Sequence, residues 1–228
     1  MVGVLDAIAD QLLGGGPRDR RSLVAVDGIG ASGKTTFASR LARRAGGREV
    51  VLLHADDFFH PAAVRHARGR WSPEGFWLDA YDYDALVGWA LEPLATGRGR
   101  YRDHCYDRGT GTAVRPAPRT AAPDAVLVVE GTFLHRDRLV DLWDRSVYLH
   151  VPFAEGLRRM AARDGVDPDV DAGPRARYVG AQRLYAADRP WARATLVLDN
   201  ADPTAPRVVR PDEVEDAVRR ELALLAVS

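Results

Sequence analysis

The residues with the clearest chemical meaning lie near the start of the chain, where positions 28–35 read Gly-Ile-Gly-Ala-Ser-Gly-Lys-Thr. This is a complete Walker A pattern: a glycine, four residues, then Gly-Lys-Thr. A short apolar run at 23–26 precedes it, and apolar residues at helical spacing follow it. The loop is therefore expected between a buried strand and a helix N-terminus, which is the context in which this pattern binds phosphate.

Each residue type in this loop has a physical role. The glycines at 28, 30 and 33 allow the backbone to turn successive N–H groups toward one point, where the helix dipole adds partial positive charge. Lys34 is predicted to reach the β- and γ-phosphates of a nucleoside triphosphate, and Thr35 to bind Mg²⁺. The predicted ATP-binding residues are Gly28, Gly30, Ala31, Ser32, Gly33, Lys34, Thr35 and Thr36.

Lys34 is also the only lysine of the chain, since the other 31 of its 32 basic residues are arginines. Arginine replaces lysine at most exposed positions at little cost. A single retained lysine therefore indicates a position where a compact ammonium is needed and a planar guanidinium does not fit. Its place in the Walker A loop agrees with that interpretation.

Carboxylates follow two further apolar runs of the sequence. Asp56 and Asp57 come just after the second run, and Glu130 ends the third run beside a glycine, which is the Walker B pattern. Because ligands of doubly wound sheets bind at the carboxyl ends of the strands, these acids are expected near the phosphate loop. Asp56, Glu130 and Thr35 are the predicted Mg²⁺ ligands. One of the two aspartates can take the proton of an attacking hydroxyl, and the alternation of side chains leaves that role to only one of them.

Arginines on a predicted amphipathic helix at 153–164 add positive charge. Arg159 and Arg163 are candidates for neutralising a transferring phosphoryl group through bidentate hydrogen bonds. For either residue, the alternative is a solvated helix face. The stretch 164–171 that follows is acidic.

Other classes of Walker A protein fit this sequence less well. Regulatory GTPases read guanine through Asn-Lys-x-Asp, which would require a second lysine, and the Leu-Ser-Gly-Gly-Gln signature of transporter ATPases is absent. Small-molecule kinases combine a strand followed by a carboxylate, another ending in an acid, and an arginine-bearing helix. This sequence has all three.

Together these motifs resemble the uridine kinase-like branch of P-loop kinases, which includes uridine kinase, phosphoribulokinase and bacterial pantothenate kinase. The resemblance spans roughly residues 20–200. The stretches that carry it are the loop at 28–35, Asp56-Asp-Phe-Phe59, Tyr106-Asp107, Val128-Val-Glu-Gly131, and Arg159 with Arg163-Asp164.

The resemblance implies ATP and Mg²⁺ as cofactors. It also implies that Asp56 is the catalytic base, with Asp57 as the alternative base, and that Lys34, Arg159 and Arg163 are the other catalytic residues. It implies acceptor-binding roles for Asp57, Phe59, Asp79 and Tyr106, with Asp79 on a ribose hydroxyl and Tyr106 beside the base. Two departures concern this pocket. Phe59 stands where uridine kinases usually have tyrosine, and the histidine that usually follows Tyr106-Asp107 is missing.

The acceptor implied by the resemblance is a nucleoside. The alternatives are another small hydroxyl acceptor, such as pantothenate, nicotinamide riboside or a secondary metabolite, and a nucleotide-binding regulator without catalysis. The sequence leaves open whether ATP or GTP is the donor.

Five strand-like runs, at 23–26, 50–54, 125–130, 147–151 and 195–198, alternate with helices. This alternation predicts an α/β P-loop NTPase, with a mainly parallel five-stranded sheet sandwiched by helices. The 228 residues are expected to form a single kinase domain. Its core is predicted at about 20–60 and 123–228, with an inserted acceptor-binding and lid region at about 60–122.

Composition excludes several other functions. The 32 acidic and 32 basic residues leave no formal net charge, which argues against nucleic-acid binding through a general basic surface. The single Cys105 excludes a disulfide framework. No apolar run approaches the roughly 18 residues that span a bilayer, and the first residues lack the layout of a signal peptide. We expect a cytoplasmic protein whose partner is a small-molecule hydroxyl acceptor, without nucleic acid or membrane, and the resemblance leaves room for a homo-oligomer.

Overall fold

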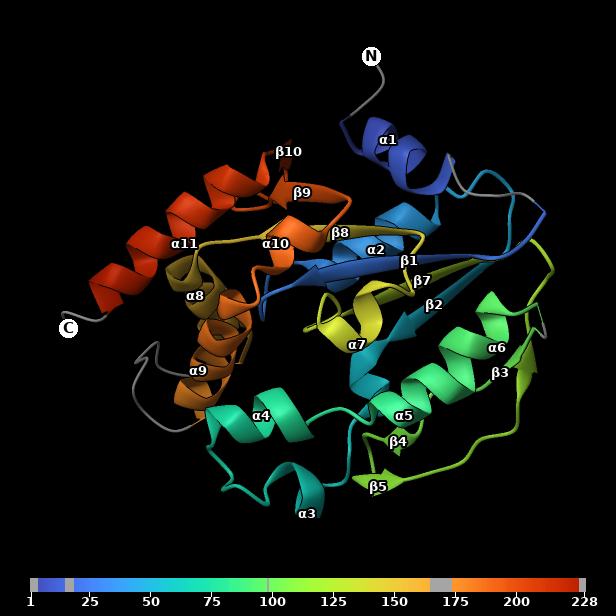
Figure 1. Cartoon of the computed structure of the whole chain (residues 1–228), viewed down its shortest axis with the longest axis horizontal. Coiled ribbons are helices and arrows are strands. Elements are labelled where there is room, and N and C mark those ends of the chain that lie inside the picture. The colour runs from blue at the N-terminus through green and yellow to red at the C-terminus, as the bar shows by residue number, and fades with distance from the viewer. Residues whose placement is uncertain (1–3, 15–18, 98, 165–173, 226–228) are drawn as a thin grey trace.

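The computed structural model describes residues 4–14, 19–97, 99–164 and 174–225, and its centre is a six-stranded sheet (Figure 1). The strand order is β10-β9-β8-β1-β7-β2. The bounds are β1 Ser22–Gly28, β2 Val50–His54, β7 Val126–Gly131, β8 Arg145–His150, β9 Leu196–Asp199 and β10 Arg207–Val208. The five predicted strands are all present and mutually parallel, which confirms the predicted fold class. The sixth strand, β10, is a two-residue antiparallel addition at the edge beside β9.

The order of the strands places the phosphate loop at the middle of the sheet. From β1 the chain crosses to β2 at one edge, returns to β7 between them, and then continues to β8 on the other side of β1. The loop at 28–33 leaves the carboxyl end of β1 between these two directions. Such a switch point opens a crevice above the sheet, where ligands of open α/β sheets bind.

Both faces of the sheet are covered, because neighbouring residues of β1 face opposite sides. Val24 and Val26 pack with the helical segments before β1 and with α2 (Lys34–Ala42), whereas Leu23 and Ala25 belong to a second, larger core. That second core includes helices on the other side of the sheet: α5 Tyr83–Leu86, the π-helical turn η3 Val87–Leu91, α6 Glu92–Ala95, α10 Pro190–Arg193 and α11 Pro211–Leu225. The first segments are α1 Val4–Ala9 and the π-helical turn η1 Asp10–Gly14.

The segment between β2 and β7 lies beyond one end of the sheet, at the bottom of Figure 1. It begins with the 3-10 turn η2 Ala55–Phe58 and the helices α3 Ala62–Arg65 and α4 Pro73–Asp79. After α6 it forms two small hairpins. One pairs β3 Arg100–Tyr101 with β6 Arg119–Thr120, and the other pairs β4 Tyr106–Asp107 with β5 Thr112–Ala113. The short helix α7 Asp137–Val140 follows β7.

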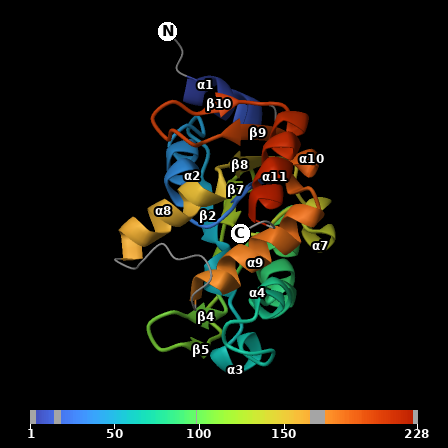
Figure 2. The same cartoon turned by 90° about the vertical axis from the view of Figure 1, so that its left-hand side faces the viewer.

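Two helices form the side wall of the molecule. The predicted helix at 153–164 is α8 Phe153–Asp164, and the next helix is α9 Pro174–Ala187, which the sequence analysis did not predict. Figure 2 shows α9 lying beside α4. There the ring of Tyr178 packs edge-on against Phe76, with ring centroids 4.9 Å apart. Residues 165–171 of the acidic stretch lie outside the described ranges.

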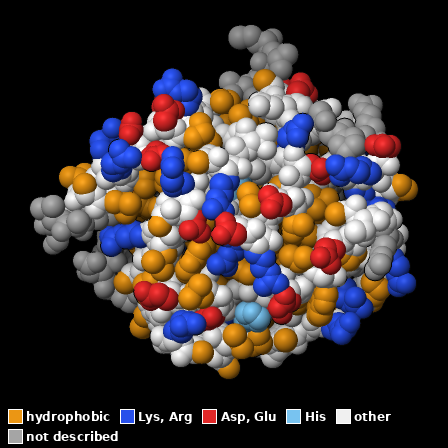
Figure 3. Space-filling model, in the orientation of Figure 1, with side chains coloured by type: hydrophobic (Ala, Val, Ile, Leu, Met, Phe, Trp, Pro, Cys, Tyr) orange, Lys and Arg blue, Asp and Glu red, His pale blue; other side chains and the backbone are white. Residues whose placement is uncertain are grey.

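The surface has both signs of charge. Figure 3 shows acidic and basic side chains interspersed on one face of the molecule, in agreement with the zero formal net charge of the sequence. In the described ranges, no helix is both long enough and apolar enough to cross a membrane.

Candidate active site

The phosphate loop has the backbone conformation that its glycines predict at two positions. Gly33 has φ +90°, in the left-handed region that favours glycine. Gly28 is constrained by space, since a Cβ there would lie 2.6 Å from the carbonyl oxygen of Leu149. Gly30 does not adopt the left-handed backbone conformation that its residue type allows. The residue that does so is its neighbour Ala31, at φ 58°. At position 30 a Cβ would instead meet the end of Met160 at 2.7 Å.

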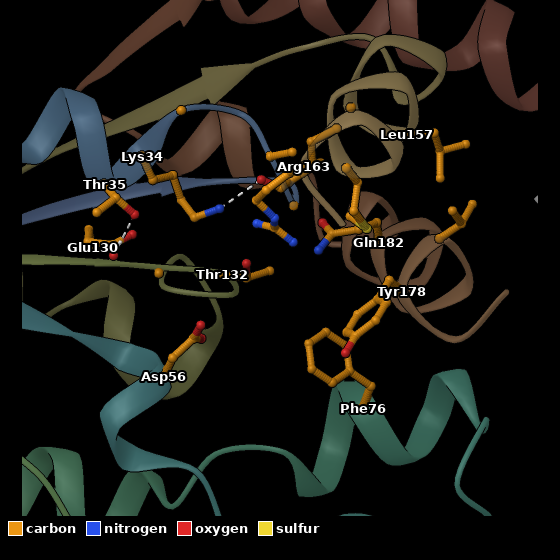
Figure 4. Close-up of a pocket in the computed structure, with 18 of the residues that line it drawn as sticks. Lys34, Thr35, Asp56, Phe76, Glu130, Thr132, Leu157, Arg163, Tyr178 and Gln182 are labelled. Carbon is orange, nitrogen blue, oxygen red and sulfur yellow. Dashed lines mark hydrogen bonds between the residues drawn. The ribbon is translucent and has the colours of Figure 1, made fainter. Parts of the chain in front are cut away.

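A cavity of about 490 Å³ opens beside this loop (Figure 4). It brings together predicted residues from the phosphate loop, η2, β7 and α8: Gly30, Ala31, Gly33, Lys34, Thr35, Thr36, Asp56, Phe59, Glu130 and Arg163. The predicted residues that do not line it are Gly28, Ser32, Asp57, Asp79, Tyr106 and Arg159.

The side chain of Lys34 lies along the inside of the loop. Its Nζ donates to the carbonyl oxygens of Gly28, at 3.0 Å, and Ile29, at 2.7 Å. Burial lowers the pKa of Lys34, and the negative charges of Glu130, Asp27 and Asp56 oppose that shift. The ammonium is therefore held at the cavity with its charge balanced by carboxylates rather than by bulk water.

Glu130 contacts residues from two neighbouring segments, the start of α2 and the end of β2. Its Oε1 accepts a hydrogen bond from Thr35 Oγ1 at 3.0 Å and lies 2.6 Å from Nδ1 of His54. Burial disfavours the charged form of Glu130, but the bond from His54 and the charge of Lys34 prevail and lower its pKa. The hydrogen bond with Glu130 in turn raises the pKa of His54.

His54 had no predicted role, although its position at the end of a predicted strand pointed toward the site. It is the last residue of β2 and stands opposite Glu130 in the parallel register of β2 and β7. Facing residues on neighbouring strands interact directly. The register that pairs them depends on the alignment of the two strands, which no local pattern of the sequence specifies.

The cavity has oxygen donors suited to Mg²⁺. Thr35 and Glu130 lie together, and Figure 4 shows Asp56 below them in the same cavity. Hydroxyl and carboxylate oxygens are the ligands that this hard cation prefers. No group of three or more His, Cys, Asp or Glu side chains in the described ranges could hold a metal alone. The donor set therefore fits an ion that completes its shell with water and phosphate oxygens.

The structure distinguishes the two adjacent aspartates. Asp56 points into the cavity, and its Oδ1 accepts a hydrogen bond from the Tyr81 hydroxyl at 2.9 Å. Burial raises the pKa of Tyr81 well above its ordinary value, so this phenol stays protonated as the donor. Asp57 lies outside the cavity lining and pairs with Arg108 at 2.8 Å. Burial raises the pKa of Asp57, while the charge of Arg108 opposes the shift.

Only one of the four predicted acceptor residues, Phe59, lines the cavity, where it stacks on Tyr81 with centroids 4.8 Å apart. Tyr106 is buried behind Phe59, at 6.2 Å and edge-on. Asp79 is the last residue of α4 and pairs with Arg68 at 2.8 Å. The residue of α4 that faces the cavity is Phe76, three positions earlier.

The two candidate arginines of α8 line two different hollows. Arg163 lines the cavity with Lys34, whereas Arg159 lines a second hollow of about 340 Å³ that also borders the phosphate loop. Arg159 is held there by Glu155, at 2.7 Å, and by the carbonyl oxygen of Ala201, at 2.6 Å. Thr36 lines both hollows, so they are neighbours.

Several residues of the cavity wall were not predicted. Tyr178, Val179 and Gln182 come from α9, and Tyr81 and Thr132 come from segments that follow α4 and β7. The sequence held one sign that Tyr178 and Gln182 act together. They are four positions apart, and residues four apart share a helix face.

Asp27, immediately before the phosphate loop, is a fully buried carboxylate that also was not predicted. It accepts hydrogen bonds from the backbone N–H groups of Gly28, at 2.6 Å, Leu134, at 3.0 Å, and His135, at 3.1 Å. The His135 ring nitrogen Nδ1 lies 2.9 Å away, and the Tyr185 hydroxyl donates to the same carboxylate. Asp27 thus joins the phosphate loop to the segment after β7 and to α9.

Comparison with known proteins gives no match to a model of a protein family. Nicotinamide riboside kinase 1 of Rattus norvegicus is 28% identical over 149 residues, which cover 64% of this chain and 69% of the relative. Pantothenate kinase of Bradyrhizobium diazoefficiens is 30% identical over an alignment of 233 positions, which covers 88% of this chain and 72% of the relative. A solved structure of a possible uridine kinase from Bacillus stearothermophilus has a TM-score of 0.66 and 24% identity, and the match covers 85% of this chain and 96% of that one.

The fold and the phosphate loop define a P-loop NTPase. The chain belongs to the uridine kinase-like family of P-loop kinases, as its motifs predicted. It is therefore a small-molecule kinase, a phosphotransferase with an alcohol group as acceptor.

The buried Asp27 network generates a test of stability. Asp27→Asn should lower the free energy of unfolding by about 2–5 kcal/mol, because an NH₂ group would face donors in a fully buried site. Tyr185→Phe removes one donor and should cost about 1–2 kcal/mol. Urea unfolding measures both.

The matched control for this pair is Asp216→Asn, whose side chain is 62% exposed. It should stay within about 0.5 kcal/mol of the wild type. An Asp27→Asn variant as stable as this control would contradict the anchoring role of Asp27.

Proposed function

We propose that the protein transfers the γ-phosphoryl group of ATP to a hydroxyl group of a nucleoside-like small molecule. One observation carries the proposal. A carboxylate, Asp56, lies in the same cavity as Lys34 and Thr35 of the phosphate loop, beside a wall of aromatic rings. A base, a phosphate-binding loop and a flat apolar wall in one cavity are what phosphorylation of a ring-bearing alcohol requires.

The two hollows suggest how the donor lies. The N–H groups of the loop and the ammonium of Lys34 would bind the β- and γ-phosphates. The hollow beside Arg159 and Asn200 would receive the base, because a guanidinium plane can stack on a flat ring. Thr36, which lines both hollows, would lie beside the phosphates that pass between them.

Thr35 and the phosphate oxygens would hold Mg²⁺ directly, and Glu130 and Asp56 would hold it through bound water. A magnesium ion bound there would offset the negative charge of the phosphates. His54 supports this role, since its hydrogen bond helps to keep Glu130 ionised at neutral pH.

Asp56 would take the proton of the acceptor hydroxyl while the new bond to the γ-phosphorus forms and the bond to the β,γ-bridging oxygen breaks. Tyr81 engages one oxygen of this carboxylate, Oδ1, which leaves the other for the hydroxyl. Arg163 would oppose the charge on the transferring group.

The wall of the cavity favours a nucleoside-like acceptor. The aromatic residues Phe59, Phe76, Tyr81 and Tyr178 line the same cavity as Asp56. Rings of this kind stack on or pack around a planar group. The relatives named for nicotinamide riboside agree with a riboside. The relative with the longer alignment is a pantothenate kinase, so pantothenate is the second candidate. We infer one kinase domain, in which the insert at about 60–122 supplies Phe76 and Tyr81 to the acceptor.

Acceptor-dependent release of ADP tests the proposal. Purified protein with ATP and Mg²⁺ should release ADP faster when uridine, cytidine, nicotinamide riboside or pantothenate is added, and the phosphorylated product should appear in equal amount. Lys34→Ala is the control and should lose this activity. ADP release that no acceptor on this panel stimulates would contradict the proposal.

Asp56→Asn should lower kcat by roughly 10²–10⁴-fold with little change in the KM for ATP, because a positioned base contributes about that factor. Asp57→Asn is the matched control at the adjacent position, whose side chain pairs with Arg108. It should retain most of the turnover. The reverse pattern, with Asp57→Asn inactive and Asp56→Asn near normal, would assign the base to Asp57.

Arg159→Ala should raise the KM for ATP by about 5- to 10-fold, because a stacked guanidinium would be lost from the base hollow. The KM for the acceptor should not change. Arg158→Ala, in a neighbouring residue that also pairs with Glu155 but is 68% exposed, is the control. Equal KM values for ATP in the two variants would show that Arg159 does not contact the donor.

A further inference from the structure

Gln182 is the unexplained polar group of the cavity. It lies on α9, lines the cavity, and is only 7% exposed. Its Oε1 is buried and has no hydrogen-bond partner in the described ranges. Figure 4 shows its amide group at the cavity edge, near Arg163 and above Tyr178.

Three charged groups of the same cavity are engaged. Asp56 accepts from Tyr81, Glu130 accepts from Thr35, and Lys34 donates to loop carbonyls. A buried polar group without a partner is rare, because its lost hydration is not replaced. An orphan amide in a ligand cavity therefore indicates that the missing partner belongs to the ligand.

The chemistry of an amide defines that partner. A glutamine side chain presents one acceptor oxygen and one donor NH₂ side by side, so it pairs best with an edge that also has an adjacent donor and acceptor. Carboxamides and ring lactams have such an edge. A carboxylate does not, because both of its oxygens are acceptors when it is ionised.

The residues around Gln182 limit what the rest of the bound ligand can be. Tyr178 lies one helical turn earlier on α9, and Phe76 packs edge-on against it with centroids 4.9 Å apart. Val179 adds apolar surface from the same helix. A flat apolar body with one polar edge fits this corner, whereas a bare polyol would leave the rings against hydroxyl groups.

We propose that Gln182 is a specificity residue, which selects acceptors that carry an amide-type edge, a carboxamide or ring lactam, on the part of the molecule that is not phosphorylated. The inference rests on the proposed kinase function and narrows its acceptor class. It predicts that the corresponding acid or N-methylated analogue is a poorer substrate, since one partner of the buried amide is then missing.

Matched pairs of acceptors test the proposal with the full-length protein, ATP and Mg²⁺. Nicotinamide riboside is compared with nicotinic acid riboside, and uridine with 3-methyluridine. We expect kcat/KM for the amide or lactam member to be about 10- to 100-fold higher. Gln182→Leu, which is similar in size, should bring this ratio close to one. It should do so by raising the KM of the preferred member, with the KM for ATP unchanged.

Two further variants separate this role from a structural one. Leu184→Gln changes a residue of the same helix that is 36% exposed, and it should leave the ratio as in the wild type. Gln182→Glu keeps an acceptor oxygen but adds negative charge, so it should reject nicotinic acid riboside more strongly than the wild type does. Binding of nicotinamide riboside to this variant, measured by calorimetry, gives a readout apart from turnover.

A wild-type ratio near one would overturn the assignment, and so would a ratio that Gln182→Leu leaves unchanged while turnover persists. Failure of every acceptor to stimulate ADP release is a different result. It would overturn the proposed kinase function and, with it, the role of Gln182.

Discussion

The charge balance around Lys34 is the constraint on which the rest of the site depends. Taking an ammonium out of water is costly unless carboxylates compensate it, and burial does lower the pKa of this lysine. Glu130 and Asp56 supply the compensation from two other segments, and Asp27 adds to it from behind the loop. The sheet must therefore bring the ends of β1, β2 and β7 to one place. Glu130 is stabilised in return, by His54 and by Lys34 itself.

A second constraint joins the two sides of the cavity. Asp27 lies behind the phosphate loop, and the helix that supplies Tyr178 and Gln182 is tied to it through Tyr185. The donor side and the proposed acceptor side therefore share one buried anchor. Because buried polar networks tolerate only a few arrangements, such an anchor sets the distance between the loop and the acceptor wall more firmly than apolar contacts alone would.

In two places, nearby residues of the same type have different surroundings in the folded protein. Asp56 and Asp57 lie on one turn after β2, yet one faces the cavity and the other pairs with Arg108. Arg159 and Arg163 lie one turn apart on α8, yet they line two different hollows beside the phosphate loop. In each case the local partners, rather than the residue type, decide which chemistry is available to the side chain.

The sequence alone determined the elements whose signals are local. The Walker A loop, the strand that ends in Glu130, the five parallel strands and the helix at 153–164 each follow from periodicity or from a continuous motif, and so does the family. The tertiary structure decided what depends on residues far apart in the chain. His54 meets Glu130 through strand register, and Gln182 and Tyr178 reach the cavity because α9 packs on α4. These contacts join segments separated by tens of residues, and no local pattern specifies which long-range pairing lowers the free energy most.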